Sequence, residues 1–208
     1  MAFSDLFTNL HLFIRWLHVI AGIVWIGHLY FFNFVNVPLQ ASLDDAGKKA
    51  VNPKLLPRAL WWFRWGAMIT FLAGLVLFTM NYMFVPGTGF GPSSLFQDEN
   101  GLTQRAVWIL MGMLLGAVMW FNVWFIIWPA QKRMLSGRVP AEQLPAVRRR
   151  AYLASRTNTF LSGPMLFGML APGHYGAVNT VTLAVFALLG LAPLFWAIRA
   201  SSKVGTSV

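Results

Sequence analysis

The sequence contains no cysteine among its 208 residues. This absence excludes disulfide bonds, thiolate-bound metals, iron–sulfur clusters and covalently attached c-type haem within the chain. Charged residues are also scarce, at 11% of the chain, whereas a soluble domain carries roughly a quarter. Apolar residues make up 57%, and several apolar runs reach the length of about 20 residues that a membrane-spanning helix needs. The composition therefore predicts a single integral membrane domain over residues 1–208.

Acidic residues are missing from all the apolar segments. Their absence argues against a proton relay built on carboxylates and against a cation transporter with acidic ligands. The N-terminus lacks a basic region followed by a small-residue cleavage site, so we interpret the first apolar segment as a retained helix. The net charge of +10 does not indicate nucleic-acid binding, because Lys and Arg gather in particular loops, as orientation signals do.

The predicted fold is an all-α integral membrane protein with five transmembrane helices. We expect these helices at about 11–36, 58–83, 105–128, 150–170 and 178–198. Pro38 and Pro129 are expected to end the first and third helices, and residues 39–57 are expected to form a polar loop. Basic residues crowd the loops after the first and third helices. The positive-inside rule then places the N-terminus outside and the C-terminus in the cytoplasm.

Two short matches indicate an internal repeat. Pro38-Leu39-Gln40 is similar to Pro129-Ala130-Gln131, and Phe71-Leu72-Ala73-Gly74 is similar to Phe160-Leu161-Ser162-Gly163. The two matches have nearly the same spacing along the chain. The sequence therefore predicts a duplicated helical hairpin, in which the first and second helices correspond to the third and fourth, followed by a fifth helix.

Ionisable side chains in the first helix are the main indication of a site, because such groups are costly at membrane depth. His18 lies one turn after Arg15, and the small residues Ala21 and Gly22 leave a shallow patch beside it. The predicted topology puts His174 on the same outer side. We therefore expect His18 and His174 to hold the iron of a haem b near the periplasmic face, with Arg15 at the propionates and Gly22 beside the ring. A bound quinone and a plain interhelical hydrogen bond of His18 are the alternatives.

The fourth helix is the most polar of the predicted spans. Asn158 and Ser162 share one face of it, and Pro164 frees a backbone carbonyl. This face either lines a cavity or makes interhelical hydrogen bonds. For Arg64 and Arg156 we favour side chains that extend to the cytoplasmic surface.

Other candidate positions have simpler explanations. We expect His11 to be exposed at the membrane interface and His28 to have a packing role. Gly112 and Gly116 form a Gly-x-x-x-Gly pattern, which is typical of two helices in close contact.

Five motifs follow one another along residues 12–175. They are Arg15-Trp-Leu-His18 with Trp25-Ile-Gly27; Leu60-Trp-Trp-Phe63-Arg-Trp; Asn122-Val-Trp-Phe with Pro129-Ala-Gln131; Ser155-Arg-Thr-Asn158 with Pro164; and His174-Tyr175. Together they resemble the N-terminal domain of the membrane-bound bacterial urate oxidases (urate hydroxylases). The resemblance implies a multi-helix domain of the bacterial inner membrane, joined in longer members to a c-type cytochrome that takes electrons from urate oxidation.

The resemblance also bears on the site. His18, Asn158 and His174 match the family pattern, and the resemblance implies that they are cofactor-binding positions. The chain has no Cys-x-x-Cys-His motif, so it is identified as a short form without the cytochrome domain. Leu110 and Thr157 stand where longer members carry histidine.

Three functions remain open at this point. The first is a membrane redox protein that binds haem b and links a quinone or small substrate to a cytochrome partner. The second is a cofactor-free accessory subunit of a larger respiratory or photosynthetic membrane complex. The third is a urate-oxidising enzyme. The lipid bilayer is an expected partner in each case, and nucleic acid in none.

Overall fold

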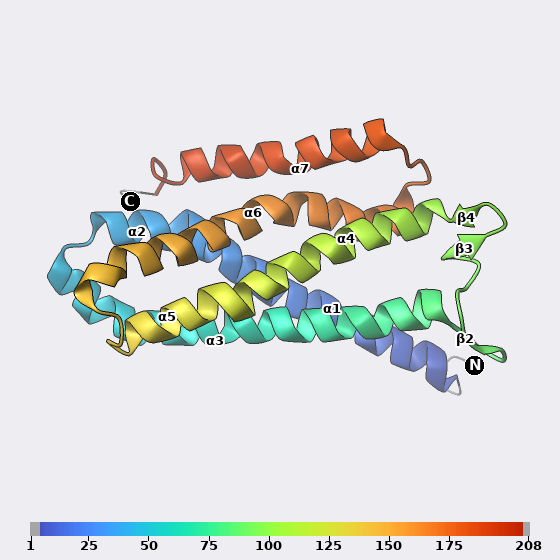
Figure 1. The fold of residues 1–208 in the computed structure, drawn as a ribbon, viewed down its shortest axis with the longest axis horizontal. Helices are drawn as coiled ribbons and strands as arrows, with labels where there is room; N and C mark the ends of the chain where they lie inside the picture. Colours follow the sequence, from blue (N-terminus) through green and yellow to red (C-terminus); the bar gives the residue numbers. More distant parts are fainter. Residues whose placement is uncertain (1–4, 206–208) are drawn as a thin grey trace.

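The protein, described by a computed structural model over residues 5–205, is almost entirely helical. Within that range the chain forms five long helical rods that lie side by side along one axis (Figure 1). This arrangement confirms the all-α prediction.

The elements follow one another in a simple up-and-down order. The first rod contains α1 (Leu6–Tyr30), the π-helix η2 (Phe31–Asn36) and α2 (Val37–Ser42). The second contains α3 (Asp45–Phe78) and the π-helix η3 (Thr79–Met83). The third contains α4 (Gln104–Phe121), the π-helix η4 (Asn122–Ile127) and α5 (Trp128–Leu135). The 3-10 turn η5 (Ala141–Gln143) leads into the fourth rod, α6 (Leu144–His174), and the fifth is α7 (Thr180–Ala200).

Two very small antiparallel ribbons connect the second rod to the third. In the first ribbon β1 (Phe84–Val85) pairs with β2 (Gly89–Phe90), and in the second β3 (Gln97–Asp98) pairs with β4 (Gly101–Leu102). Both ribbons lie at the same end of the bundle (Figure 1).

The predicted loop over residues 39–57 is wrong, because the chain is helical there except at a short break. Asp44 begins α3 as its N-cap, and its carboxylate accepts a hydrogen bond from the Gly47 N–H at 2.7 Å. Gln40 of α2 and Asn52 of α3 exchange two amide hydrogen bonds of 2.7 and 2.9 Å, which tie the two helices together. The length of an apolar run marks the part of a helix that suits the bilayer, and polar residues continue the helix beyond it.

Pro38 and Pro129 do not end their helices, and the reason is the same at both positions. Each proline follows a π-helix, in which the Val37 N–H donates to the carbonyl of Phe32 and the Trp128 N–H donates to that of Val123, five residues back. The proline then stands in the first turn of the next α-helix, where its missing N–H is tolerated. The π-helix η4 begins 91 residues after the π-helix η2, at the spacing of the sequence repeat.

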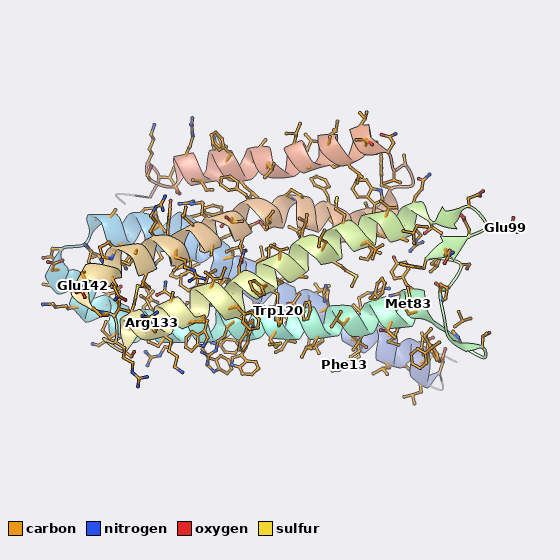
Figure 2. All side chains as sticks on the ribbon, in the orientation of Figure 1. Phe13, Met83, Glu99, Trp120, Arg133 and Glu142 are labelled. Carbon is orange, nitrogen blue, oxygen red and sulfur yellow. The ribbon has the colours of Figure 1, made fainter. Side chains whose placement is uncertain are left out.

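The two ends of the bundle differ in charge. We call one end the basic end. It carries the exposed residues Lys49, Lys54, Arg133, Arg148, Arg149 and Arg150. Figure 2 shows Arg133 and Glu142 at this end, and Met83 and Glu99 at the opposite one. The C-terminal end of α7 also lies at the basic end, whereas α1 begins at the opposite end (Figure 1).

Four helical segments are long and apolar enough to cross a membrane. They are Leu6–Ser42, Asp45–Met83, Gln104–Leu135 and Thr180–Ala200. The fourth rod, α6, packs against both α4 and α7, but its first turns carry three consecutive arginines and its middle carries a row of polar side chains. The protein is therefore an integral membrane protein by its helices, and a fifth crossing by α6 stays a prediction.

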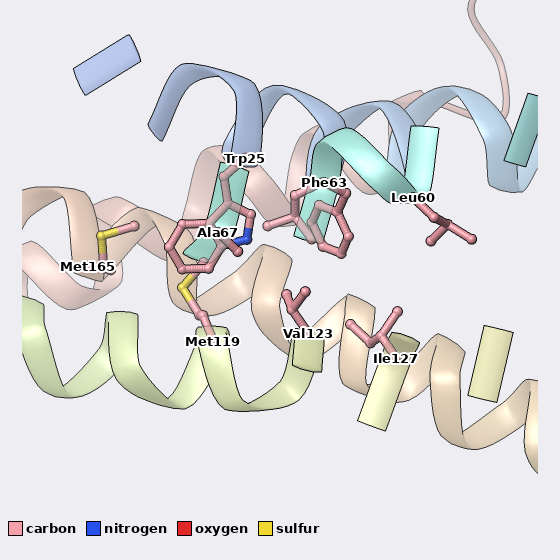
Figure 3. Packing of buried hydrophobic residues seen from close by; sticks show 9 residues of the cluster. Trp25, Leu60, Phe63, Ala67, Met119, Val123, Ile127 and Met165 are labelled. Atoms are coloured by element: carbon pink, nitrogen blue, oxygen red, sulfur yellow. The ribbon is translucent and has the colours of Figure 1, made fainter. Parts of the chain in front are cut away.

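The core forms where four rods meet near the middle of the bundle. Trp25 of α1, Phe63 of α3, Met119 of α4 and Met165 of α6 are all buried in one cluster (Figure 3). Since lipid tails are as apolar as these side chains, close packing stabilises the contact more than removal from water does. The α1–α3 and α4–α6 pairs make the most extensive contacts, as a pair of similar hairpins would.

Candidate functional site

A stripe of polar side chains runs along α6 and holds the bundle together. Asn158 is fully buried, donates to the Met119 carbonyl at 2.9 Å and accepts from the Asn122 amide at 2.8 Å. One helical turn further on, Ser162 pairs with Tyr30 of α1 at 2.9 Å. In the other direction Ser155 accepts from Asn33 of η2 at 2.9 Å.

This stripe answers one question that the sequence left open. For Asn158 and Ser162 the sequence allowed either a cavity lining or interhelical hydrogen bonds. Their side chains make interhelical hydrogen bonds. Two partners, Asn33 and Asn122, stand in the π-helices η2 and η4, whose wider turns change which side chains face the interior. Asn158 therefore makes its hydrogen bonds to α4 and η4. The sequence predicts this residue as a cofactor-binding position.

His18 is partly buried against α3. Its Nδ1–H donates to the backbone carbonyl of Thr70 at 2.9 Å. Gly74, one turn further along α3, leaves room for the imidazole: a Cβ built there would lie 3.0 Å from His18 Cε1. The Thr70 bond fixes the proton on Nδ1, so the other ring nitrogen, Nε2, is the one that carries a lone pair.

The small residues after His18 also face α3. Ala21 is buried, and a Cβ built on Gly66 would lie 3.3 Å from the Ala21 carbonyl oxygen. A Cβ built on Gly22 would make ordinary van der Waals contact with Thr70. Gly22 therefore packs toward α3, where the sequence predicted an open patch for a flat cofactor.

His174 is the last residue of α6 and is exposed at the end of the bundle where α1 begins. No hydrogen bond or ring contact described for residues 5–205 joins it to His18. The sequence placed both histidines on one side of the membrane, and the structure puts them on α1 and at the far end of α6. Their pairing on one iron stays a prediction.

Arg15 and His11 form a small polar group with η3. The His11 Nε2 lies 3.1 Å from Asn81 Oδ1, and an Arg15 guanidinium nitrogen lies 3.4 Å from the same His11 atom. His11 is therefore partly buried against the second rod, whereas the sequence predicted an exposed side chain. The partner of His11 is the amide side chain of Asn81 in η3 and not an acid, and the sequence pattern did not indicate this contact.

His28 bonds within its own helix, since its Nδ1–H donates to the Val24 carbonyl at 2.8 Å. The same side chain lines an open, largely apolar groove between α1 and α3, together with Arg58 and Trp62. The packing role predicted for His28 stays a prediction.

A bare metal ion and a haem need different sets of protein ligands. No three His, Asp or Glu side chains among residues 5–205 come close enough to bind an ion together. A haem supplies four nitrogen ligands of its own and needs only axial partners from the protein. A histidine that ligates a metal usually donates its other ring N–H to a carbonyl or carboxylate, and His18 has this arrangement with Thr70.

The fold and its buried polar stripe define a multi-helix integral membrane protein. The profile of the family "Urate oxidase N-terminal" matches residues 4–90 and 92–201, nearly the whole chain. The protein therefore belongs to the urate oxidase N-terminal family. Comparison with curated proteins found no match, and neither did comparison with solved structures.

Proposed function

We propose that this protein is a membrane redox subunit that binds a haem b through His18. The observation that carries the proposal is the 2.9 Å bond between His18 Nδ1 and the Thr70 carbonyl. It holds the imidazole in the tautomer whose Nε2 lone pair can bind iron, and the absence of a side chain at Gly74 gives the ring its space. A bound haem would supply reversible one-electron transfer within the bilayer.

His174 is the proposed second histidine that would hold the haem, and Arg15 would meet its propionates. The orientation follows from the positive-inside rule: the basic end faces the cytoplasm, and the end with His174 faces the periplasm of a bacterial inner membrane. A haem held by these residues would lie nearer the periplasmic face and would supply electron exchange between a quinone or small substrate and a cytochrome partner.

Haem content of the purified protein tests the proposal. His18→Ala removes the ligand and is expected to lose the haem. Gly74→Ala places a Cβ 3.0 Å from His18 Cε1 and is expected to shift the haem spectrum with the haem retained. Gly27→Ala is the matched control, because a Cβ there meets nothing within 4 Å. Equal haem content in all four proteins would overturn the role of His18.

Family membership favours a second candidate function, oxidation of urate. That reading predicts that urate reduces an added cytochrome c only when this protein is present. A protein that holds no haem and shows no such activity, but purifies in fixed ratio with a larger respiratory or photosynthetic complex, is an accessory subunit instead.

A further inference from the structure

An open groove of about 530 Å³ runs along the outer surface of the bundle between the first and second rods. Ile23 and Val24 of α1, Phe31 of η2, and Leu55 and Trp62 of α3 form apolar parts of its wall. Ile23 and Trp62 are both more than half exposed. Both rods are long and apolar enough to cross a membrane, so the groove opens toward lipid. Its volume lies in the range of sites for ligands larger than a single ring.

A missing side chain leaves part of this space open. Gly27 lines the groove, and a Cβ built there meets nothing within 4 Å. Gly66 on the facing helix differs, because a Cβ built there would lie 3.0 Å from the Trp25 backbone nitrogen. Gly66 therefore allows close contact between the helices, whereas Gly27 adds to the volume of the groove.

His28 places a hydrogen-bond acceptor in the apolar wall. Its Nδ1–H donates to the Val24 carbonyl at 2.8 Å. A charged imidazole is costly at membrane depth, so the neutral ring carries its lone pair on Nε2. No hydrogen bond of Nε2 is described within residues 5–205, and Nε2 is not among the buried polar atoms that lack a partner. The atom is therefore accessible, and an occupant with an O–H donor can reach it from the groove.

The other side chains of the wall define the shape and the entry route of an occupant. Phe31 and Trp62 supply aromatic surface from the two rods, which favours contact with a planar ring. Arg58 lies near the basic end of the groove and donates to the Lys54 carbonyl of its own helix. An occupant that enters from the bilayer has to be lipid-soluble. A phospholipid tail meets that condition but has no donor for His28.

We propose that this groove binds a lipid-soluble hydroquinone from the bilayer. One ring O–H donates to His28 Nε2, the ring contacts Phe31 and Trp62, and the apolar tail lies over Ile23. The proposal rests on the proposed redox function, to which it assigns a quinone site apart from His18. Because a neutral His28 accepts at Nε2 and does not donate there, the site binds the hydroquinone more tightly than the quinone, whose oxygens only accept.

Binding to nanodiscs made of phosphatidylcholine tests the proposal. Decylubiquinol, held reduced by dithionite, and decylubiquinone, held oxidised by ferricyanide, are each added to nanodiscs with and without the protein. The ligand retained above the amount in empty nanodiscs gives its dissociation constant. We expect decylubiquinol to bind at least about fivefold more tightly than decylubiquinone, as one hydrogen bond would produce.

Substitutions in the groove identify the groups responsible. His28→Leu removes the acceptor and is expected to make the two affinities equal. Gly27→Leu fills the open space and is expected to weaken the binding of both forms at least about tenfold, as loss of apolar contact would produce. Val19→Leu is the matched control, because Val19 is an exposed residue of α1 outside the groove wall. It should bind both forms as the wild-type protein does.

Three results would overturn the proposal. Retention no greater than in empty nanodiscs would indicate a groove filled by lipid tails. Equal affinity for the two forms in the wild-type protein would exclude the bond to His28. Unchanged binding in Gly27→Leu would place the ligand elsewhere. The Gly27→Leu side chain enters open space, so this test stands even if His28→Leu fails to fold.

Failure of this site and failure of the haem site are distinguishable. A protein with a flat visible spectrum that binds decylubiquinol with the expected preference would keep the groove site and reject the haem. A b-type haem spectrum without decylubiquinol binding would reject the groove site alone. Repetition of the binding measurement in His18→Ala is expected to leave the preference for decylubiquinol unchanged.

Discussion

Gly163 of α6 and Gly190 of α7 meet backbone to backbone. A Cβ built on Gly163 would lie 2.1 Å from the Gly190 carbonyl oxygen, and a Cβ on Gly190 would lie 2.7 Å from the Gly163 carbonyl carbon. This contact fixes the distance at which α7 packs on the bundle. Gly112 and Gly168 make a similar contact between α4 and α6, with a built Cβ 2.6 to 2.9 Å from the opposing backbone.

Gly190→Ala is expected to destabilise the protein by about 1–3 kcal/mol, because the backbone at Gly163 cannot move aside as a side-chain end can. Denaturant unfolding in detergent measures the loss. Gly116→Ala is the matched control, since a Cβ there meets only Met165 and Met169 side chains at 3.9 Å. A loss at Gly116 as large as that at Gly190 would contradict the backbone contact.

Removal of the Asn158 side chain tests the polar stripe. Asn158→Ala leaves the Asn122 amide and the Met119 carbonyl without their described partner in the interior. The expected cost is about 1–3 kcal/mol in unfolding free energy. Thr157→Ala, at the exposed neighbour, should change stability by less than about 0.5 kcal/mol. Equal effects of the two substitutions would show that the stripe does not hold the helices together.

The contact between Arg64 and Trp128 joins the second and third rods. The guanidinium carbon lies 3.7 Å from the Trp128 ring centre. The predicted extension of Arg64 to the cytoplasmic surface stays a prediction. A double-mutant cycle with Arg64→Met and Trp128→Leu should give a coupling of about 0.5–2 kcal/mol. Trp62 is 55% exposed, so the same cycle with Trp62→Leu should give a coupling near zero.

These contacts show which parts of the structure were predictable. The apolar runs located the helices, since bilayer thickness sets the length of such runs. They did not locate the helix ends: residues 39–57 are polar and helical. Pro38 and Pro129 have the sequence signature of helix ends, and only the preceding π-helix, which depends on tertiary packing, lets the rod continue.

Close approach of glycines was predictable only in part. The Gly112 and Gly116 pattern indicated a tight contact, and Gly112 makes one, but Gly116 meets only flexible methionine ends. Gly163 and Gly190 have no such pattern with a second glycine on their own helix. Their pairing depends on how α7 is positioned on α6, which the sequence alone does not state. The His11 contact with Asn81 was missed for the same reason.

The proposed orientation has a direct test. Ser136→Cys lies at the basic end and Ser94→Cys lies near the β-ribbons at the opposite end, and both positions are exposed. In intact cells with a permeable outer membrane, a membrane-impermeant thiol reagent should label Ser94→Cys and not Ser136→Cys. Inverted vesicles should give the reverse pattern. Labelling of Ser136→Cys in intact cells would place the basic end outside and contradict the orientation.

The central claim is that His18 holds a haem. The most direct test is the absorption spectrum of the detergent-purified protein, oxidised and then reduced with dithionite. We expect a b-type difference spectrum in the wild-type protein and its loss in His18→Ala, with the helical circular dichroism unchanged. A flat visible spectrum of the wild-type protein, with no haem recovered on extraction, would contradict the account and favour the cofactor-free accessory subunit.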